Sequence, residues 1–205
     1  MKKYHLFITI FFSLSILGYA GTDDAIPKAE VLDLSPMLYS NYIGLSYTSL
    51  KLINKNNLAS FTGKGVSIKV GHRLNRFIAF EGRYSKSTKV KYSKGKSILT
   101  KDDNNYPTIF TNIGFYVKPS LPIKKLSIYS LFGYGRVELT NIPKGDVNRA
   151  ESSLQLGGGV EYFLPNHSSL FVDYTSIYQG QGFDYLGTSD QHKADMFSVG
   201  VNYHF

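Results

Sequence analysis

The most regular feature of the sequence is a two-residue alternation of apolar and polar positions that recurs along most of the chain. It is clearest in the last ten residues, where one face carries Phe197, Val199, Val201, Tyr203 and Phe205. Such alternation predicts β-strands with one apolar face. The same reasoning predicts eight strands, over 42–48, 66–71, 78–84, 109–118, 126–137, 154–162, 170–175 and 196–205.

The connections between these strands alternate in length. Short turns are expected at 74–76, 119–125 and 164–167, and the other four connections are long and rich in Lys, Asn, Asp, Ser and Gly. Short turns at one rim and long loops at the other are typical of a membrane-spanning β-barrel. The pattern therefore predicts an all-β fold, an eight-stranded antiparallel up-and-down transmembrane β-barrel.

Glycines decide which face of each strand points inward. A soluble barrel would turn its polar face to water, but here that face is dominated by glycine, which weakens a water-facing strand. A narrow lumen has room for only a few large side chains, so it suits this face. The glycines in question are Gly44, Gly71, Gly114, Gly133, Gly135, Gly157, Gly159 and Gly200.

Charged residues within the predicted strands fall on the same face as the glycines. On the lipid face, a Lys or Arg would cost about 2–4 kcal/mol at the bilayer midplane, whereas inside the barrel opposite charges can pair. We expect a lumen charge network of Lys69, Arg73, Glu81, Arg83, Lys118, Glu161 and Asp173. Aromatic girdles at the membrane interfaces are expected from Tyr39, Tyr84, Tyr116, Tyr162, Tyr178 and Tyr203.

The N-terminus has the features of an export signal. Lys2 and Lys3 precede an apolar run over 6–17, and Gly18-Tyr19-Ala20 supplies small residues where a signal peptidase reads them. The run is shorter than the roughly 20 residues of a membrane-spanning helix. We therefore expect a signal peptide over 1–20 cleaved after about Ala20, a periplasmic lead-in segment over 21–38, and the barrel domain over 39–205.

Composition fits an exported barrel. The chain has no Cys, so disulfides cannot stabilise it, and its 16 Tyr and 14 Phe are numerous for a slightly polar mean hydropathy of −0.15. The formal charge of +8 favours anionic partners without identifying them. No cofactor and no nucleic-acid partner are predicted.

The C-terminal residues Val201-Asn202-Tyr203-His204-Phe205 resemble the signal that the barrel-assembly machinery reads in bacterial outer-membrane proteins. In that signal, Val201, Tyr203 and Phe205 hold the alternate apolar or aromatic positions. The whole barrel region resembles the small eight-stranded proteins of the OmpX/Ail, OmpA-transmembrane and opacity-protein group, loosely termed the porin family. The resemblance implies a monomer in the bacterial outer membrane, in contact with lipid and lipopolysaccharide. It carries over no functional residues.

A lysine-rich segment is the strongest candidate for a binding surface. Its lysines could bind lipopolysaccharide phosphates or an acidic host or envelope polyanion, which favours a structural or adhesin-like surface protein. The alternative is a solvated loop beside the anionic outer leaflet. Val90 and Tyr92 continue the alternation, so the strand is expected to project beyond the membrane. The candidate anion-binding residues are Lys86, Lys89, Lys91, Lys94, Lys96 and Lys101.

Two other classes of function stay open with less support. A narrow channel is one, although an eight-stranded barrel is filled by its own side chains and cannot be a general pore. An enzyme acting on outer-leaflet lipid A is the other, and no catalytic residues are predicted for it. His192 is the only histidine expected near the long loops, and we expect it to be solvent-exposed. No metal site is predicted, because Asp184, Asp190 and Asp195 match no ion-binding motif.

Overall fold

The computed structural model describes residues 40–55, 60–93, 105–106, 109–140, 149–181 and 191–205. The predicted signal peptide and lead-in segment therefore lie outside the described residues, as do Tyr39, Asp184 and Asp190. So do Lys94, Lys96 and Lys101, whereas Lys89 is described only by its backbone. No helix in the described ranges is long and apolar enough to cross a membrane.

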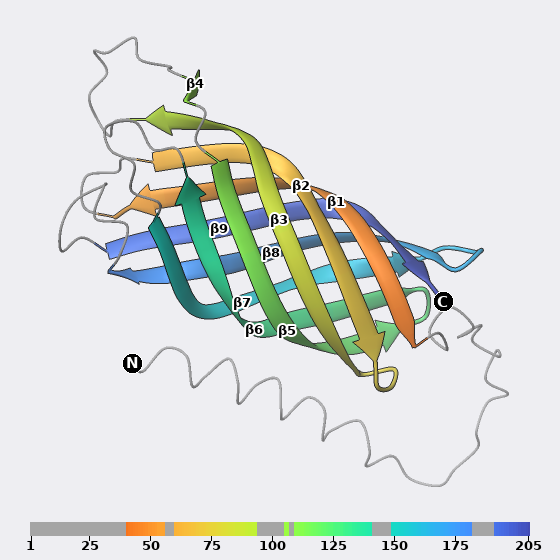
Figure 1. The fold of residues 1–205 in the computed structure, drawn as a ribbon. Helices are drawn as coiled ribbons and strands as arrows, with labels where there is room; N and C mark the ends of the chain where they lie inside the picture. The colour runs from red at the N-terminus through yellow and green to blue at the C-terminus, as the bar shows by residue number, and fades with distance from the viewer. Residues whose placement is uncertain (1–39, 56–59, 94–104, 107–108, 141–148, 182–190) are drawn as a thin grey trace, which may run out of the picture. The chain divides into compact units, whose positions relative to one another are not determined.

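Within the described residues, eight long strands and one two-residue strand form a single antiparallel sheet (Figure 1). Each long strand pairs with the next long strand along the chain. The short β4 pairs only with Val90 and Lys91 of β3. The strands are β1 (Asn41–Asn54), β2 (Ser60–Arg73), β3 (Ile78–Ser93), β4 (Asn105–Tyr106), β5 (Ile109–Ile123), β6 (Leu126–Thr140), β7 (Arg149–Phe163), β8 (Ser168–Gln181) and β9 (Gln191–His204).

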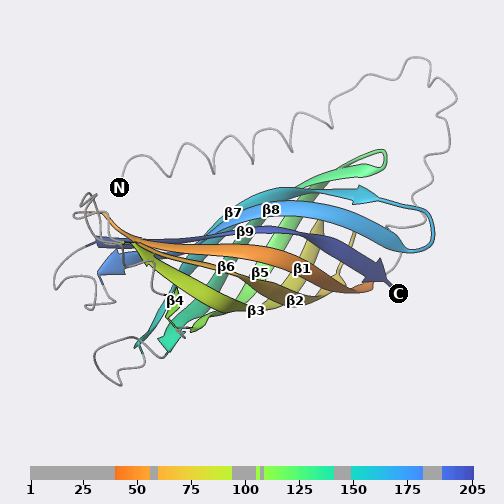
Figure 2. The same ribbon diagram turned by 90° about the horizontal axis from the view of Figure 1, so that it is seen from above.

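The sheet closes on itself because β1 pairs with β9. Leu45 lies opposite Val201 in this ladder, and backbone hydrogen bonds join Asn41 to Phe205 at 3.1 and 2.9 Å. Figure 2 shows the strands wrapping around a common interior with a strong tilt. Closure leaves no unpaired sheet edge, which is the condition for β-structure to cross lipid. The predicted eight-stranded up-and-down barrel is confirmed.

Three tight turns join the strands at one end of the barrel, called here the short-turn end; the opposite rim is the long-loop end. In the β2–β3 turn, the Asn75 side-chain oxygen accepts hydrogen bonds from the backbone of Phe77 and Ile78 at 2.8 and 2.9 Å. In the other two turns, Lys124, Asn166 and His167 adopt positive φ of 54°, 66° and 62°. The turns at 74–76 and 164–167 agree with the sequence analysis, whereas the turn expected over 119–125 is shorter, because β5 continues to Ile123 and only Lys124 and Lys125 form it.

One interruption in the ladder reshapes the wall near the long-loop end. The β2–β3 register shifts between Lys64 and Gly65, and a Cβ atom on Gly65 would collide with the backbone of Lys86. Glycine is therefore required at this bulge. Beyond it, β3 continues to Ser93 and still pairs with β2, as its continued alternation predicts.

Alternation places apolar side chains on the outer face over most of the wall. Tyr84, Tyr162 and Tyr203 are exposed there. Tyr116 and Tyr178, which we expected in the girdles, are instead buried inside the barrel. Tyr116 follows the inward-facing Gly114 by two residues, whereas a register shift between Ser176 and Tyr178 turns Tyr178 inward beside Ile177. The girdle assignment is wrong for these two tyrosines.

Candidate functional site: the lumen and the lysine patch

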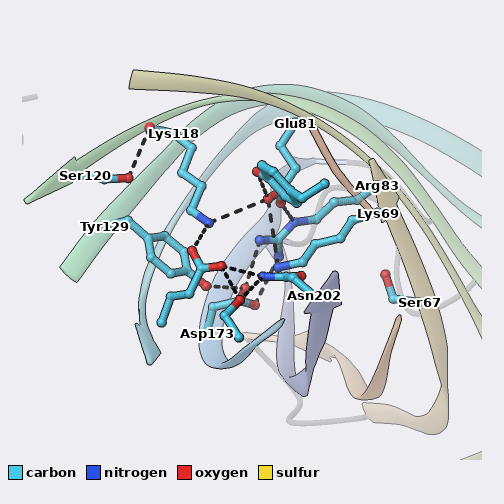
Figure 3. Close-up of polar contacts among 12 residues, drawn as sticks. Ser67, Lys69, Glu81, Arg83, Lys118, Ser120, Tyr129, Asp173 and Asn202 are labelled. Atoms are coloured by element: carbon cyan, nitrogen blue, oxygen red, sulfur yellow. Dashed lines mark hydrogen bonds and ion pairs between the residues drawn. The ribbon is translucent and has the colours of Figure 1, made fainter. Parts of the chain in front are cut away.

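Seven charged side chains meet in the half of the lumen nearer the short-turn end, all at most 6% exposed. Figure 3 labels Lys69, Glu81, Arg83, Lys118 and Asp173 among them. The structure thus brings together every residue of the expected network, from β2, β3, β5, β7 and β8. Four are cations and three are carboxylates. This ionic cluster comprises Lys69, Arg73, Glu81, Arg83, Lys118, Glu161 and Asp173.

Glu161 on β7 is one centre of the ionic cluster. Its carboxylate accepts hydrogen bonds from Lys118 Nζ at 2.9 Å and from Arg73 Nη2 at 3.2 Å. The other carboxylate oxygen accepts bonds from Ser169 Oγ and Asn202 Nδ2, each at 2.6 Å. Charge-assisted hydrogen bonds of this kind satisfy a buried carboxylate that would otherwise be costly to desolvate.

Arg83 on β3 is the other centre. Its guanidinium donates two hydrogen bonds to Asp173, at 3.0 and 2.8 Å, and a third through Nε to Glu81. Tyr129 also donates a hydrogen bond to Asp173, at 2.9 Å. Lys69 Nζ lies 3.8 Å from Glu81 and 3.1 Å from the centre of the Phe171 ring. The planar fork of arginine therefore joins β3 to β8 through Asp173 and also holds Glu81 on its own strand.

Glycines provide the space for these long side chains, as the sequence analysis supposed. The ring of Tyr42 lies across Gly71, where any Cβ atom would collide with it. Its hydroxyl then reaches Glu81, to which it donates a hydrogen bond at 2.5 Å. The small residues of the inner face thus let a tyrosine and the ionic cluster fill the same narrow section of lumen.

The lumen nearer the long-loop end is apolar, which the sequence analysis did not anticipate. A cluster of buried side chains fills it, each at most 4% exposed. The neighbouring outward positions there carry Lys51, Lys91 and Glu138, so the polarity of the alternation is reversed. This apolar cluster comprises Leu50, Leu52, Phe61, Val90, Phe110, Val137, Leu139, Ile177, Tyr178, Ala194 and Met196.

The reversal was visible in short sequence segments. Leu50-Lys51-Leu52 and Val137-Glu138-Leu139 alternate as a soluble barrel would, with apolar residues inward and charges outward. Since a lipid-facing charge is expensive, the reversed segments lie above the hydrocarbon region. The barrel wall therefore extends beyond the membrane at the long-loop end.

His192 corrects another expectation. We expected a solvent-exposed loop residue, but β9 begins at Gln191, and His192 faces inward with 0% exposure. The two-residue period of β9 continues further than the sequence suggested and brings this imidazole next to the apolar cluster.

His204 makes a contact that resembles a catalytic Ser–His pair but lacks the geometry of a proton relay. Ser169 Oγ lies 2.9 Å from His204 Nε2, and Glu161 lies 3.5 Å from the same nitrogen. A relay needs the carboxylate on the other ring nitrogen, and within the described residues His204 Nδ1 makes no hydrogen bond. All three side chains are buried, so they act as part of the lumen packing. In the part of the chain that the structure describes, no group of three or more potential ligands is arranged to hold a metal ion.

Two lysines of the candidate binding surface have described side chains, and both lie on the outer face of the wall near the long-loop end. Lys86 and Lys91 of β3 are exposed, and the backbone of Lys89 pairs with Lys64 of β2. Two exposed lysines that the sequence analysis missed join them, Lys51 on β1 and Lys64 on β2. They were missed because only the strand register brings them beside β3: Lys51 and Lys91 both flank Thr62.

These four lysines form what we call the lysine patch: Lys51, Lys64, Lys86 and Lys91. The only acidic residue in the described parts of β1, β2 and β3 is Glu81, which points into the lumen. Asp195 on β9 lies next to Lys51 in register, but it forms an ion pair with Lys193 at 2.8 Å. In the described parts of β1, β2 and β3, the outer face immediately above the apolar band therefore carries only positive charges.

At the C-terminus, Val201, Tyr203 and Phe205 face outward and are about half exposed. Tyr203 stacks on Phe205 with ring centres 6.4 Å apart, and its other side lies against His167 at 6.3 Å. These three positions form a continuous apolar strip at the short-turn end of β9. Their role as an assembly signal stays a prediction.

A closed barrel with a lipid-facing apolar band and a filled lumen defines a class, the small integral proteins of bacterial outer membranes. The family model for the outer membrane protein beta-barrel domain matches residues 39–205, and the chain belongs to this family. Its location is accordingly the bacterial outer membrane. No curated protein sequence shows significant similarity to the chain.

Solved structures share the fold at low sequence identity. Ail, the attachment invasion locus protein of Yersinia pestis, is 15% identical with a TM-score of 0.52, over 82% of this chain and 99% of that one. Neisserial surface protein A is 19% identical with a TM-score of 0.54, over 80% and 97%. AlkL is 14% identical with a TM-score of 0.57, over 90% and 97%. At these identities the likeness shows the fold alone.

Proposed function

We propose that this outer-membrane barrel is a surface-binding protein whose lysine patch holds the phosphate or sulfate groups of a polyanion. The observation that carries the proposal is the patch itself. Four exposed lysines lie on three adjacent strands whose described residues offer no outward carboxylate. A concentration of one sign of charge on a surface attracts ligands of the opposite sign, so this arrangement favours an anionic ligand.

The position of the patch supports the same function. Lys86 directly follows the apolar outward positions of β3, and Lys64 directly precedes those of β2. A lysine at this boundary is suited to contact lipid phosphates and glycans above them, which supports the proposal. The other candidate lysines, Lys94, Lys96 and Lys101, follow Lys91 in the sequence and lie outside the described residues.

One structural relative gives a chemical precedent. Ail has been solved in complex with the heparin analogue sucrose octasulfate. That ligand belongs to Ail, and the low identity transfers no residues. It does show that a barrel of this fold accommodates a sulfated polyanion.

The filled lumen argues against the channel alternative. Solutes would have to pass the ionic cluster, whose members are hydrogen-bonded across the barrel, and then the apolar cluster. We also propose no enzymatic activity, since the Ser169–His204 contact lacks an orienting carboxylate and is buried.

The test is binding of a heparin oligosaccharide and of lipopolysaccharide by the detergent-folded barrel at low and high salt. In the patch variant, Lys64, Lys86 and Lys91 are replaced by Ser. The control removes three exposed cations from the short-turn end, by Arg76→Ser, Lys124→Asn and Lys125→Ser. Both variants have the same net charge.

The proposal is supported if binding weakens with salt and if the affinity falls at least tenfold in the patch variant but not in the control variant. Salt acts because the screening length falls from about 10 Å at 0.1 M to about 3 Å at 1 M. Equal loss in both variants would show a net-charge effect without a site. Unchanged binding in the patch variant would overturn the proposal.

A further inference from the structure

An apolar groove interrupts the lipid-facing surface below the lysine patch. Its volume is about 560 Å³, and it runs across β2, β3, β5 and β6. The apolar side chains that line it come from all four strands and are between 41% and 73% exposed, and the outward-facing His72 lines it towards the short-turn end. The apolar ones are Val70, Phe80, Phe115, Val117 and Phe132.

The groove exists because Gly82 occupies an outward position in the middle of the apolar band. A Cβ atom there would lie 3.4 Å from Phe115 Cε1 and 3.8 Å from Val70 Cγ2, which is room enough. No backbone clash and no positive φ requires glycine at this point. Its lack of a side chain leaves a depression between large apolar neighbours, whereas a Leu would fill it.

The depth of the groove relates it to the lysine patch. Gly82 and Lys86 share the outer face of β3, four residues apart, which is about 13 Å along a strand. Half of a hydrocarbon core of roughly 30 Å is about 15 Å. A chain that hangs from a phosphate at Lys86 therefore reaches the groove within one leaflet.

We propose that the groove seats one acyl chain of a phosphorylated glycolipid of the outer leaflet, with its phosphate held by Lys64 and Lys86. The phosphate half of this inference rests on the proposed function, whereas the acyl-chain half rests on the groove. Val66, which follows Lys64 by two residues, pairs with Lys86, so the two lysines are diagonal neighbours across the β2–β3 ladder. One phosphate group can contact both.

A phospholipid of the opposite leaflet is the competing occupant. Its phosphate would lie near Arg76 in the exposed β2–β3 turn. The lysine patch favours the outer-leaflet lipid, because it offers several cations above the same strands that form the groove. The experiment distinguishes the two sources by the lipid supplied.

The chain has no Trp, so a single engineered Trp can report on lipid contact. Phe115→Trp places the reporter in the groove, and Val199→Trp places one at an exposed position on β9, away from it. The barrel is reconstituted in phosphatidylcholine vesicles containing lipid A with brominated acyl chains, which quench nearby Trp fluorescence. Brominated phosphatidylglycerol replaces the lipid A in a second series.

Quenching gives the association constant of lipid A relative to phosphatidylcholine at each reporter. We expect this constant to be at least threefold higher at Phe115→Trp than at Val199→Trp. Adding Gly82→Leu should abolish this preference, whereas Gly82→Ala should retain most of it. Replacing Lys64 and Lys86 by Ser should also reduce it. The position of Gly82 on the lipid face means that the added Leu is compatible with folding.

The outcomes separate the inference from the proposed function. Equal quenching at the two reporters, or a preference unaffected by Gly82→Leu, would overturn the acyl-chain seat. If heparin binding were still lost in the patch variant, the proposed function would stand. Equal quenching by brominated phosphatidylglycerol would assign the groove to phospholipid and overturn the glycolipid. A preference that survives loss of both lysines would overturn their role in holding the phosphate.

Discussion

The two halves of the lumen are built on the same strands but closed by opposite chemistry. Near the short-turn end, four buried cations and three buried carboxylates are joined by hydrogen bonds between strands. Near the long-loop end, the interior contains apolar side chains and the outer face carries lysines. What changes between them is the solvent outside the wall, lipid in the first case and water or headgroups in the second.

This difference shows that the medium outside the wall decides which face of a strand is apolar. Where the outside is lipid, the outer face is apolar, and where it is water, the inner face is apolar. On β1, Gly44 and Ser46 face inward while Ile43 and Leu45 face lipid. Further along the same strand, Leu50 and Leu52 face inward while Lys51 faces outward. The strand keeps its period of two throughout, so the level at which its polarity reverses marks where it leaves the hydrocarbon.

The largest effect is expected from breaking the charge balance of the ionic cluster. Glu161→Gln removes the carboxylate that binds Lys118 and Arg73 and leaves two buried cations short of a partner. Loss of one member of a buried pair costs about 3–5 kcal/mol. Reversible guanidinium unfolding in lipid vesicles measures the free energy of unfolding.

Restoring the balance provides the control. Glu161→Gln combined with Lys118→Met removes one charge of each sign and should recover part of the loss. If Glu161→Gln alone changed the free energy of unfolding by less than 1 kcal/mol, the carboxylate would not be stabilising the two cations, and the ionic half would not differ from the apolar half as argued.

Much of the membrane-spanning half could be predicted from the sequence. Most of its outward positions are apolar, so the phase of strands such as β2 and β9 could be assigned from their own residues. The inward direction of the charged residues could then be assigned, because Arg83 or Glu161 on the lipid face would cost free energy. The family match and the fold confirm the barrel class on which these assignments depended.

The projecting half could not be predicted in the same way. Both faces of a strand in water can carry mixed side chains, so the inward direction of Leu52 or His192 depends on register with neighbouring strands. For the same reason, only two of the four lysines of the patch were predicted from the sequence. Lys86 and Lys91 were close in sequence, but Lys51 and Lys64 join them only through pairing across β1, β2 and β3.

A reciprocal exchange on β1 would locate the boundary between the two halves. Leu45→Lys puts a charge on the lipid face and is expected to cost about 2–4 kcal/mol. Lys51→Leu, six residues further along the same face, should change the free energy of unfolding by less than about 0.5 kcal/mol. Both are measured by the same unfolding experiment in vesicles. If Lys51→Leu instead stabilised the barrel by as much as Leu45→Lys destabilises it, Lys51 would lie within the hydrocarbon and the boundary would be misplaced.

The smallest effect tests whether the apolar half is a packed core. Val137 is fully buried in the apolar cluster, and its neighbour Glu138 points outward on the same strand. Val137→Ala removes the equivalent of two methylene groups and should cost about 1–2 kcal/mol, at about 0.8 kcal/mol for each. Glu138→Ala should stay within about 0.5 kcal/mol, as surface changes do. Equal costs at the two positions would mean that the projecting wall does not bury one face more than the other. A clear excess for Val137 would show that burial of apolar surface stabilises this half, so its stability should be insensitive to salt, whereas anion binding by the lysines on its outer face should weaken as salt rises.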